Sequence, residues 1–327
     1  MIIALAALSL AITFAINRRF PPEGKLHRLA DGRRLHIAQY APTERSAAAD
    51  VVLIHGASAT LGDQLLALCG TLARRYRVLA IDRPGQGWSD RLGRADASPS
   101  RQAKLIASGL KAAGVEEAII VGHSFGAAVA AALALEEPSF VRGLVFVAPA
   151  SHPWPSGVDW RYRLAATPVI GHLFTALIVP IAGSLGLEAG VTAVFAPEIP
   201  PPDYARRSGA ARAVTPGRFR ANGEDVASLK AHLAAQSKRY HEITAPCVII
   251  TGNQDSVVWP SIHSQGLARD IAGAQIVTLA GAGHMPHHSH PQEVLAAIDG
   301  MLSSRVAGEA SNLWGSARWR VIKRPDT

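Results

Sequence analysis

Cysteine is scarce in this 327-residue chain, which contains only Cys69 and Cys247. The two residues lie far apart, and each sits in an apolar segment, so they resemble small buried hydrophobic residues and not a disulfide framework. Two cysteines of this kind leave the redox compartment open. The chain also lacks internal repeats, low-complexity tracts and any aromatic-basic module of the kind that binds RNA.

Acidic residues are outnumbered, and the formal net charge is +8. Most of the excess lies in two flanks, because residues 17–45 carry a net charge of +4 and residues 305–327 carry +3. One of these flanks adjoins an apolar segment, which suits an anionic lipid surface better than a nucleic-acid groove. We therefore expect no nucleic-acid partner.

The amino-terminal segment Ile2–Ile16 has no charged side chain and ends at Arg18 and Arg19. At 15 to 16 residues it is a little shorter than the roughly 17 to 25 residues of a spanning helix. A cleaved signal peptide and a buried core helix are alternatives, but a signal peptide normally begins with positive charge. We expect residues 1–17 to be a membrane anchor that contacts lipid. The following arginines favour the cytoplasmic face for the flank that holds them.

Short apolar runs alternate with helical segments through most of the chain. This alternation of expected strands and helices predicts an α/β fold whose mostly parallel sheet has right-handed crossovers. The expected strands cover residues 35–40, 51–54, 77–81, 118–121, 143–148, 247–251 and 275–279.

The alternation of strands and helices stops between residues 151 and 240, where prolines and apolar helical stretches replace the short strands. We expect a helical insertion there, and a core built from residues 18–150 and 241–304. Residues 305–327 form a basic tail that carries two tryptophans and has no assigned role.

The segment Gly122–His123–Ser124–Phe125–Gly126 lies between an expected strand and an expected helix. Gly-x-Ser-x-Gly in this context is typical of a nucleophile elbow, in which the serine stands at the apex of a sharp turn. The alternative is a serine that only caps the helix.

A serine nucleophile requires a base and an acid that orients the base. Asp255 and His284 each follow an expected strand, and functional groups of parallel sheets gather at the carboxyl ends of the strands. Asp159 is the nearest alternative acid, and His287, His288 and His290 are alternative histidines. The order Ser124, Asp255, His284 predicts a catalytic triad.

Four motifs together make the chain similar to the α/β-hydrolase fold superfamily. They are His55–Gly56, the segment from Asp82 to Asp90, the elbow, and Gly283–His284. The resemblance covers about residues 30–150 and 240–302. It implies a mostly parallel central sheet flanked by helices, with a helical cap inserted after the sixth strand.

The resemblance also implies an oxyanion hole made by the backbone N–H groups of Ala57 and Phe125, with Ser58 as an alternative to Ala57. A serine at the elbow excludes the relatives that use aspartate there, the haloalkane dehalogenases and epoxide hydrolases. Acyl chemistry is the expected class of reaction.

The histidines near residue 287 are neighbours on one loop, and without a carboxylate or cysteine from elsewhere they would not give convergent tetrahedral ligands. We therefore expect no metal site and no cofactor. The predicted function is hydrolysis of carboxylic esters whose acyl or aromatic part is apolar. A carbon-carbon bond hydrolase, a cofactor-free perhydrolase and a non-enzymatic ligand receptor are the alternatives.

Overall fold

The computed structural model describes residues 2–42 and 49–306, so the expected tail at residues 305–327 lies almost wholly outside the described residues. The chain forms an eight-stranded sheet in the order β1-β2-β4-β3-β5-β6-β7-β8. The strands are β1 (Lys25–Arg28), β2 (Arg34–Tyr40), β3 (Asp50–Ile54), β4 (Arg77–Ile81), β5 (Ala118–His123), β6 (Val141–Val147), β7 (Cys247–Gly252) and β8 (Gln275–Leu279). Strands β1 and β2 are antiparallel to their neighbours, and the others are parallel.

Helices cover both faces of the sheet, because alternate side chains of a strand point to opposite faces. Val52 and Ile54 belong to the core that packs on α4 and α5, whereas Val51 and Leu53 belong to the core on the other face, with α14. The bounds of the flanking helices are α2 (Leu61–Gln64), α3 (Gly70–Leu72), α4 (Pro99–Ala112), α5 (Phe125–Glu136), α12 (Ser264–Asp270), α13 (Pro286–Ser289) and α14 (Pro291–Val306). The predicted α/β fold is confirmed.

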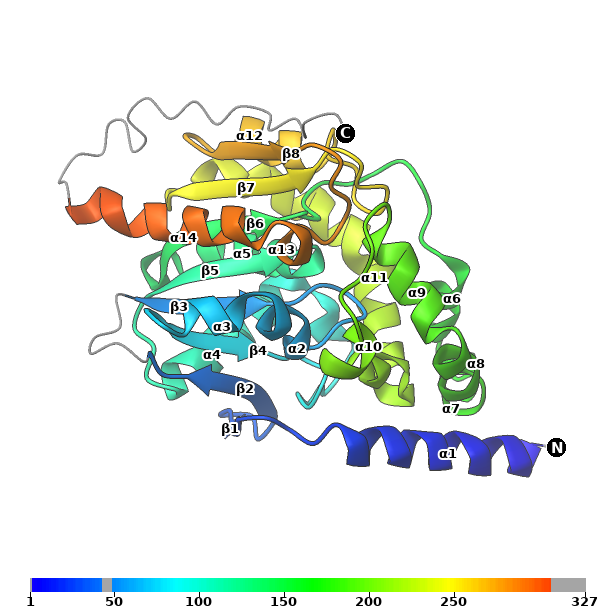
Figure 1. The fold of residues 1–327 in the computed structure, drawn as a ribbon. Coiled ribbons are helices and arrows are strands. Elements are labelled where there is room, and N and C mark those ends of the chain that lie inside the picture. Colours follow the sequence, from blue (N-terminus) through cyan, green and yellow to red (C-terminus); the bar gives the residue numbers. More distant parts are fainter. Residues whose placement is uncertain (1, 43–48, 307–327) are drawn as a thin grey trace.

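A segment that contains helices and no strand separates β6 from β7, and its helices lie beyond the carboxyl ends of the parallel strands (Figure 1). Its helices are α6 (Trp160–Ala165), α7 (Ile170–Leu177), α8 (Val179–Leu185), α9 (Leu187–Phe195), α10 (Tyr204–Arg207) and α11 (Pro216–Gln236). The expected helical insertion after the sixth strand is therefore present.

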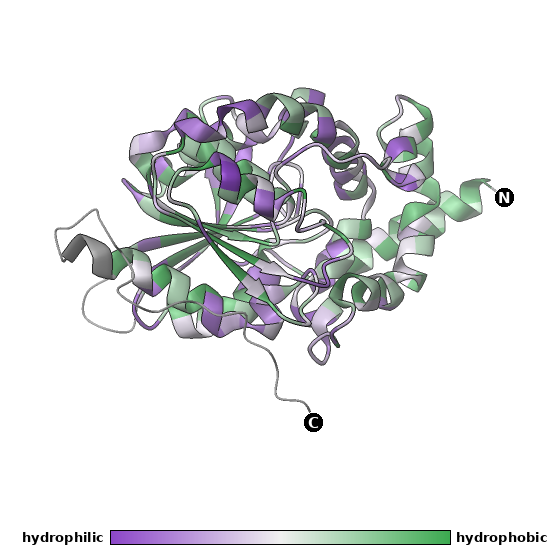
Figure 2. Cartoon of the chain, turned by 90° about the horizontal axis from the view of Figure 1, so that it is seen from above, coloured by the Kyte–Doolittle hydropathy of each residue, from purple (hydrophilic) through white to green (hydrophobic). Residues whose placement is uncertain are grey.

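The amino-terminal helix α1 (Ile2–Arg19) lies outside the sheet and packs beside α7 and α8 (Figure 1). Among the described residues it is the helix that is long and apolar enough to cross a membrane, a test that core helices and signal sequences also pass. Figure 2 shows α1 and the adjacent helices coloured mostly as hydrophobic.

Three local features differ from the sequence-based expectations. Strand β1 was not predicted, because its four residues include two exposed charges and no apolar alternation. Helix α1 continues through Arg19 instead of ending at residue 16. The helix expected at residues 65–73 begins earlier, at Leu61, where the Thr60 side chain accepts a hydrogen bond from Gly62 N, and it contains a π-helical turn.

Candidate active site

Ser124 stands between β5 and α5 with φ 52° and ψ −116°, a conformation that residues other than glycine rarely adopt. The turn requires glycine on both sides. A Cβ at Gly126 would lie 2.1 Å from the Ile54 carbonyl oxygen, and one at Gly122 would lie 2.6 Å from the Gly126 carbonyl oxygen. Such strain, of order 1–3 kcal/mol, persists only where the surrounding structure enforces it. The sharp turn expected from the sequence is therefore present.

The structure brings Ser124, His284 and Asp255 together in one hydrogen-bonded chain. His284 Nε2 lies 3.1 Å from Ser124 Oγ, and His284 Nδ1 lies 2.8 Å from Asp255 Oδ2. All three side chains are buried. Because Nδ1 faces a carboxylate, it carries the proton, which leaves Nε2 as the acceptor for the serine hydroxyl.

Asp255 also stabilises the loop after β7. Its Oδ1 accepts hydrogen bonds from Val257 N and Val258 N, both at 2.9 Å. The bonds to the loop and the interaction with His284 use different carboxylate oxygens. The alternative acid Asp159 is not part of this chain, because it caps α6 and pairs with Arg161.

Two backbone N–H groups near Ser124 have no hydrogen-bond partner within the described residues, those of Ala57 and Phe125. Both residues line the same cavity as Ser124, and Phe125 is the first residue of α5. The Ser58 N–H instead donates to Asn222 Oδ1 at 2.8 Å. Of the two alternatives, the structure therefore leaves Ala57 available to a ligand.

A buried arginine supports the loop that carries Ala57. Arg83 donates to the carbonyl oxygens of His55 and Gly56 at 3.0 and 3.1 Å, and its guanidinium lies 4.2 Å from the centroid of the Phe125 ring. Its charge is balanced by Asp225 of α11 at 2.8 Å. A completely buried charge requires such a partner. Arg83 thus contacts both the loop before Ala57 and the side chain of Phe125.

His123 connects the elbow to the loop of His284. Its Nε2 lies 2.9 Å from the His284 carbonyl oxygen, which can only accept, so Nε2 carries the proton. Its Nδ1 is buried without a partner among the described residues, and a Cβ at Gly56 would lie 2.9 Å from it. Burial, with His287 and His284 nearby, holds the pKa of His123 well below its usual value. The His123 ring is therefore neutral and fills the space between the elbow and the loop of His284.

Two of the alternative histidines, His287 and His288, lie beside a carboxylate that the sequence analysis did not identify. Asp63 Oδ2 lies 3.1 Å from His287 Nε2, and Asp63 Oδ1 lies 2.8 Å from His288 Nε2 and 2.7 Å from the Tyr204 hydroxyl. Burial alone would raise the pKa of Asp63, but the two imidazoles outweigh it and lower that pKa. The donor set is one that a divalent cation accepts. In this structure its atoms are paired with one another as hydrogen-bond partners.

A cavity of about 990 Å³ opens above Ser124 and is lined mainly by apolar side chains. The loops that follow β3, β5 and β8 contribute Ala57, Ser124 and His284 to its lining. The helical segment contributes most of its walls, including Trp160, Phe174, Ile178, Gly186, Gly190 and Val194. A volume of this size accommodates a ligand with a long apolar part.

His263 is a lining residue that the sequence analysis missed. Its Nδ1 accepts hydrogen bonds from the backbone N–H groups of Ser151 and His152, both at 3.1 Å. Burial, aided by the nearby His152, lowers the pKa of His263 to about 4. The proton of the neutral ring is therefore on Nε2. No sequence pattern marks this residue, because its partners lie more than 100 positions away.

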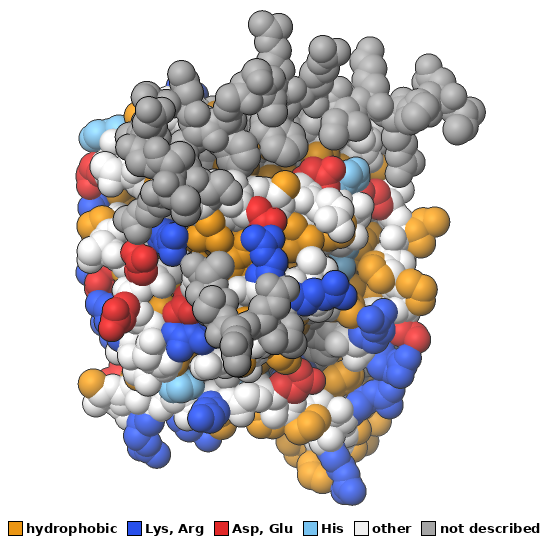
Figure 3. All heavy atoms as spheres, turned by 60° about the vertical axis from the view of Figure 1, so that its left-hand side comes forward, with side chains coloured by type: hydrophobic (Ala, Val, Ile, Leu, Met, Phe, Trp, Pro, Cys, Tyr) orange, Lys and Arg blue, Asp and Glu red, His pale blue; other side chains and the backbone are white. Residues whose placement is uncertain are grey.

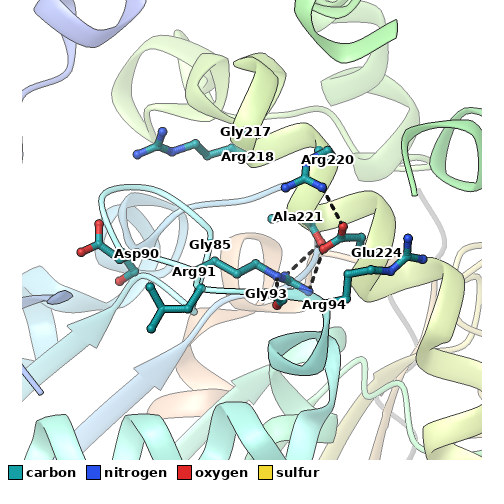
Figure 4. Close-up of a pocket in the computed structure, with 12 residues that line it drawn as sticks. Gly85, Asp90, Arg91, Gly93, Arg94, Gly217, Arg218, Arg220, Ala221 and Glu224 are labelled. Carbon is teal, nitrogen blue, oxygen red and sulfur yellow. Dashed lines mark hydrogen bonds and ion pairs between the residues drawn. The ribbon is translucent and has the colours of Figure 1, made fainter. Parts of the chain in front are cut away.

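A second cavity, of about 320 Å³, is polar and lined by several arginines (Figure 4). Arg91 and Arg220 point toward Glu224, at 3.4 and 3.0 Å, so carboxylates of α11 balance their charges (Figure 4). Neither Ser124 nor His284 lines this cavity. The apolar cavity, which holds the serine, is the candidate active site.

Comparisons with known proteins agree with this architecture. Residues 51–298 match a family model described as the alpha/beta hydrolase family. An uncharacterised protein of Mycobacterium tuberculosis is 28% identical over 280 residues, covering 79% of this chain and 76% of the relative. The pimeloyl-(acyl-carrier protein) methyl ester esterase of Stenotrophomonas maltophilia is 29% identical over 260 residues, covering 76% and 91%. The solved structure of a hydrolase from Pseudomonas aeruginosa is 25% identical, with a TM-score of 0.66 and coverage of 85% and 97%.

Proposed function

Since the chain belongs to the alpha/beta hydrolase family, we propose that it is a serine hydrolase that cleaves carboxylic esters with an apolar acyl or aromatic part. The observation that carries this proposal is the hydrogen-bonded chain from Ser124 through His284 to Asp255 at the floor of an apolar cavity.

In the proposed reaction, Ser124 Oγ attacks the ester carbonyl carbon while its proton passes to His284 Nε2. The tetrahedral intermediate then expels the alcohol, which takes that proton, and an acyl-enzyme remains. His284 then takes a proton from water, whose oxygen attacks the acyl carbon. When the second tetrahedral intermediate collapses, the C–O bond to Ser124 breaks, His284 returns the proton to Ser124 Oγ, and the carboxylic acid leaves. Asp255 stabilises the imidazolium that forms in each half-reaction.

The N–H groups of Ala57 and Phe125 are the proposed donors to the oxyanion of the tetrahedral intermediates. Neither group has another hydrogen-bond partner among the described residues, and the amino terminus of α5 adds a favourable dipole. Ser58 N–H is committed to Asn222. In the proposal, Ala57 and not Ser58 therefore acts with Phe125.

We assign residues 151–240 as the cap of this enzyme and residues 18–150 and 241–304 as its core. The cap supplies the apolar walls of the cavity, which favours an apolar acyl or aromatic group. Helix α1 is proposed as a membrane anchor that contacts lipid. Its last turn carries Arg18 and Arg19, which favours the cytoplasmic face for the enzyme.

Covalent labelling with a fluorophosphonate tests the nucleophile. Wild-type protein should be labelled and should hydrolyse p-nitrophenyl esters, and Ser124→Ala should lose both properties while remaining folded by circular dichroism. A folded wild-type protein that shows neither property would contradict the proposal. Turnover of vinylogous diketones with little ester hydrolysis would replace it with carbon-carbon bond hydrolysis.

A further inference from the structure

Helix α1 is held against the helical segment along half of its length. The Ser9 hydroxyl donates to the Ala176 carbonyl oxygen of α7, and Ile16 packs with Val179 of α8. Near its carboxyl end, Asn17 Oδ1 accepts a hydrogen bond from Arg212 at 3.0 Å. The contacts therefore begin in the middle of α1 and continue to its end.

The length of α1 then determines what else a bilayer would cover. Its 18 residues span about 27 Å, slightly less than the roughly 30 Å of a hydrocarbon core. To cross a bilayer, α1 would need its whole length, including the half that lies against α7 and α8. The parts of α7 and α8 that lie beside α1 would consequently be covered by lipid as well.

The outward surface of α7 and α8 has the composition that such a position requires. Residues 164–187 contain no aspartate, glutamate, lysine or arginine. Leu173 and Leu185 are 58% and 85% exposed, and exposed apolar groups of this size seldom gather on a water-facing surface. We define the apolar face as exposed side chains of α1, α7, α8 and the residue that joins the last two helices, namely Ile2, Ile3, Leu8, Leu10, Phe14, Ile170, Leu173, Ile178 and Leu185.

The opposite end of the molecule is different. Figure 3 shows that basic and acidic side chains are intermixed there with apolar ones. Residues 164–187, which carry no charged side chain, thus differ in composition from the face in Figure 3. A lipid layer matches residues 164–187, since α1 itself is apolar throughout and is followed by two arginines at the level where head groups would lie.

The entrance of the candidate active site adjoins the apolar face. Trp160 and Ile178 line the cavity and are at the same time 59% and 42% exposed, so they form part of its rim. Ile178 belongs both to this rim and to the apolar face. A substrate that is dissolved in the bilayer would thus meet the cavity without crossing water.

We propose that α1, α7 and α8 form one lipid-contacting surface, and that the substrate is a membrane-resident ester with a long acyl chain, which enters beside Trp160 and Ile178. The statement about substrate rests on the proposed serine-hydrolase function. The statement about lipid contact does not, so the two are tested by separate measurements.

Lipid contact is tested with an environment-sensitive fluorophore on the full chain. Leu173→Cys and the matched control Ile276→Cys, at the distant strand β8, are labelled separately in a Cys69→Ser background. Phosphatidylcholine vesicles should shift the emission of the label at residue 173 to the blue and leave the label at residue 276 unchanged. An unchanged label at residue 173, or a shift that depends on protein concentration without vesicles, overturns the proposal. The second result would assign the surface to self-association.

Substrate delivery is tested with the double variant Leu173→Glu/Leu185→Glu, whose residues do not line the cavity. Hydrolysis of a long-chain ester presented in vesicles should fall at least about tenfold, because charged groups weaken insertion of the surface. Hydrolysis of a soluble short-chain ester should change less than about twofold.

Ile276→Glu is the control and should preserve both activities. Equal loss with both substrates, or no loss with vesicles, overturns lipid delivery. Absence of hydrolysis in wild type would instead refute the serine-hydrolase function.

Discussion

The backbone N–H of Ser58 donates to the side-chain Oδ1 of Asn222 at 2.8 Å, although the two residues are 164 positions apart. The Asn222 amide nitrogen in turn donates to Ser58 Oγ at 2.9 Å. One side chain of α11 therefore fixes both the backbone and the side chain of a residue whose φ is 53°. This contact fixes the residue after Ala57, and the Arg83 contacts fix the two residues before it, so both bear on the position of the Ala57 N–H.

Asn222→Ala should consequently reduce kcat about tenfold to a hundredfold, since a displaced oxyanion donor stabilises the transition state less. KM should change little, because the cavity walls are unaffected. Asn222→Asp, which keeps an acceptor for Ser58 N–H, should restore part of kcat. Steady-state kinetics with a p-nitrophenyl ester distinguish this positioning role from a general loss of folding, which would lower activity without rescue by aspartate.

Asp255→Asn separates the two functions of this carboxylate. The amide oxygen can still accept from Val257 N and Val258 N, so the loop should survive and thermal stability should change little. Opposite His284 Nδ1, however, the amide would favour the wrong imidazole tautomer, and kcat should fall about 10³-fold to 10⁴-fold. Comparison of kcat with Tm for this variant checks the prediction. A variant that loses both in proportion would show that Asp255 serves only the loop.

That Ser124, Asp255 and His284 lie together could be predicted from the sequence, because each follows a strand of a parallel sheet and the carboxyl ends of parallel strands share one edge. The sequence left Ala57 and Ser58 as alternatives, since the choice depends on Asn222 in a distant helix. Asp63 was not predicted as a partner of these histidines for a similar reason. It lies in a short helix without a recognisable sequence motif, and its histidine partners are more than 220 positions away. Long-range polar pairing has no local sequence signature, whereas hydrophobic periodicity does.

Asp63→Ala should lower the free energy of unfolding by about 3 kcal/mol, because it leaves three buried donors without their acceptor. Asp203→Asn is the control, since that acid pairs with Arg206 at the surface and asparagine tolerates its φ of 56°, and its effect should stay below about 0.5 kcal/mol. Chemical denaturation measures both. Dialysis against a chelator should leave Tm unchanged, because the ligand atoms already pair with one another. A fall in Tm on chelation would identify a metal site there.

Stability should also decline as the pH falls. The folded state lowers the pKa of His55 and His263 to about 4, mainly through burial, and lowers those of His123 and His287 in the same direction. Below about pH 6.5 the unfolded chain binds protons that the folded chain does not. The free energy of unfolding therefore falls with decreasing pH, by up to about 1.4 kcal/mol per pH unit for each such histidine. Urea denaturation between about pH 7 and pH 5 measures the slope, and a flat profile would contradict the neutral assignments.

Acyl-chain length should be limited at Gly190 of α9. This residue lines the cavity, and a Cβ added there would meet no atom within 4 Å, so a larger side chain can occupy space without displacing the helix. Gly190→Leu should reduce kcat/KM for long-chain esters by about tenfold or more, which corresponds to about 1.4 kcal/mol of lost binding, and should spare acetate esters.

Gly217→Leu is the matched control, because a Cβ at Gly217 also meets no atom within 4 Å but that residue lines the arginine cavity. It should leave the dependence on chain length unchanged. If Gly190→Leu lowers activity equally on short and long esters, the acyl group does not extend between α8 and α9. The acyl chain of the substrate would then have to lie nearer the rim of the cavity at Trp160. In that case Trp160→Ala, and not Gly190→Leu, would change the preference for acyl-chain length.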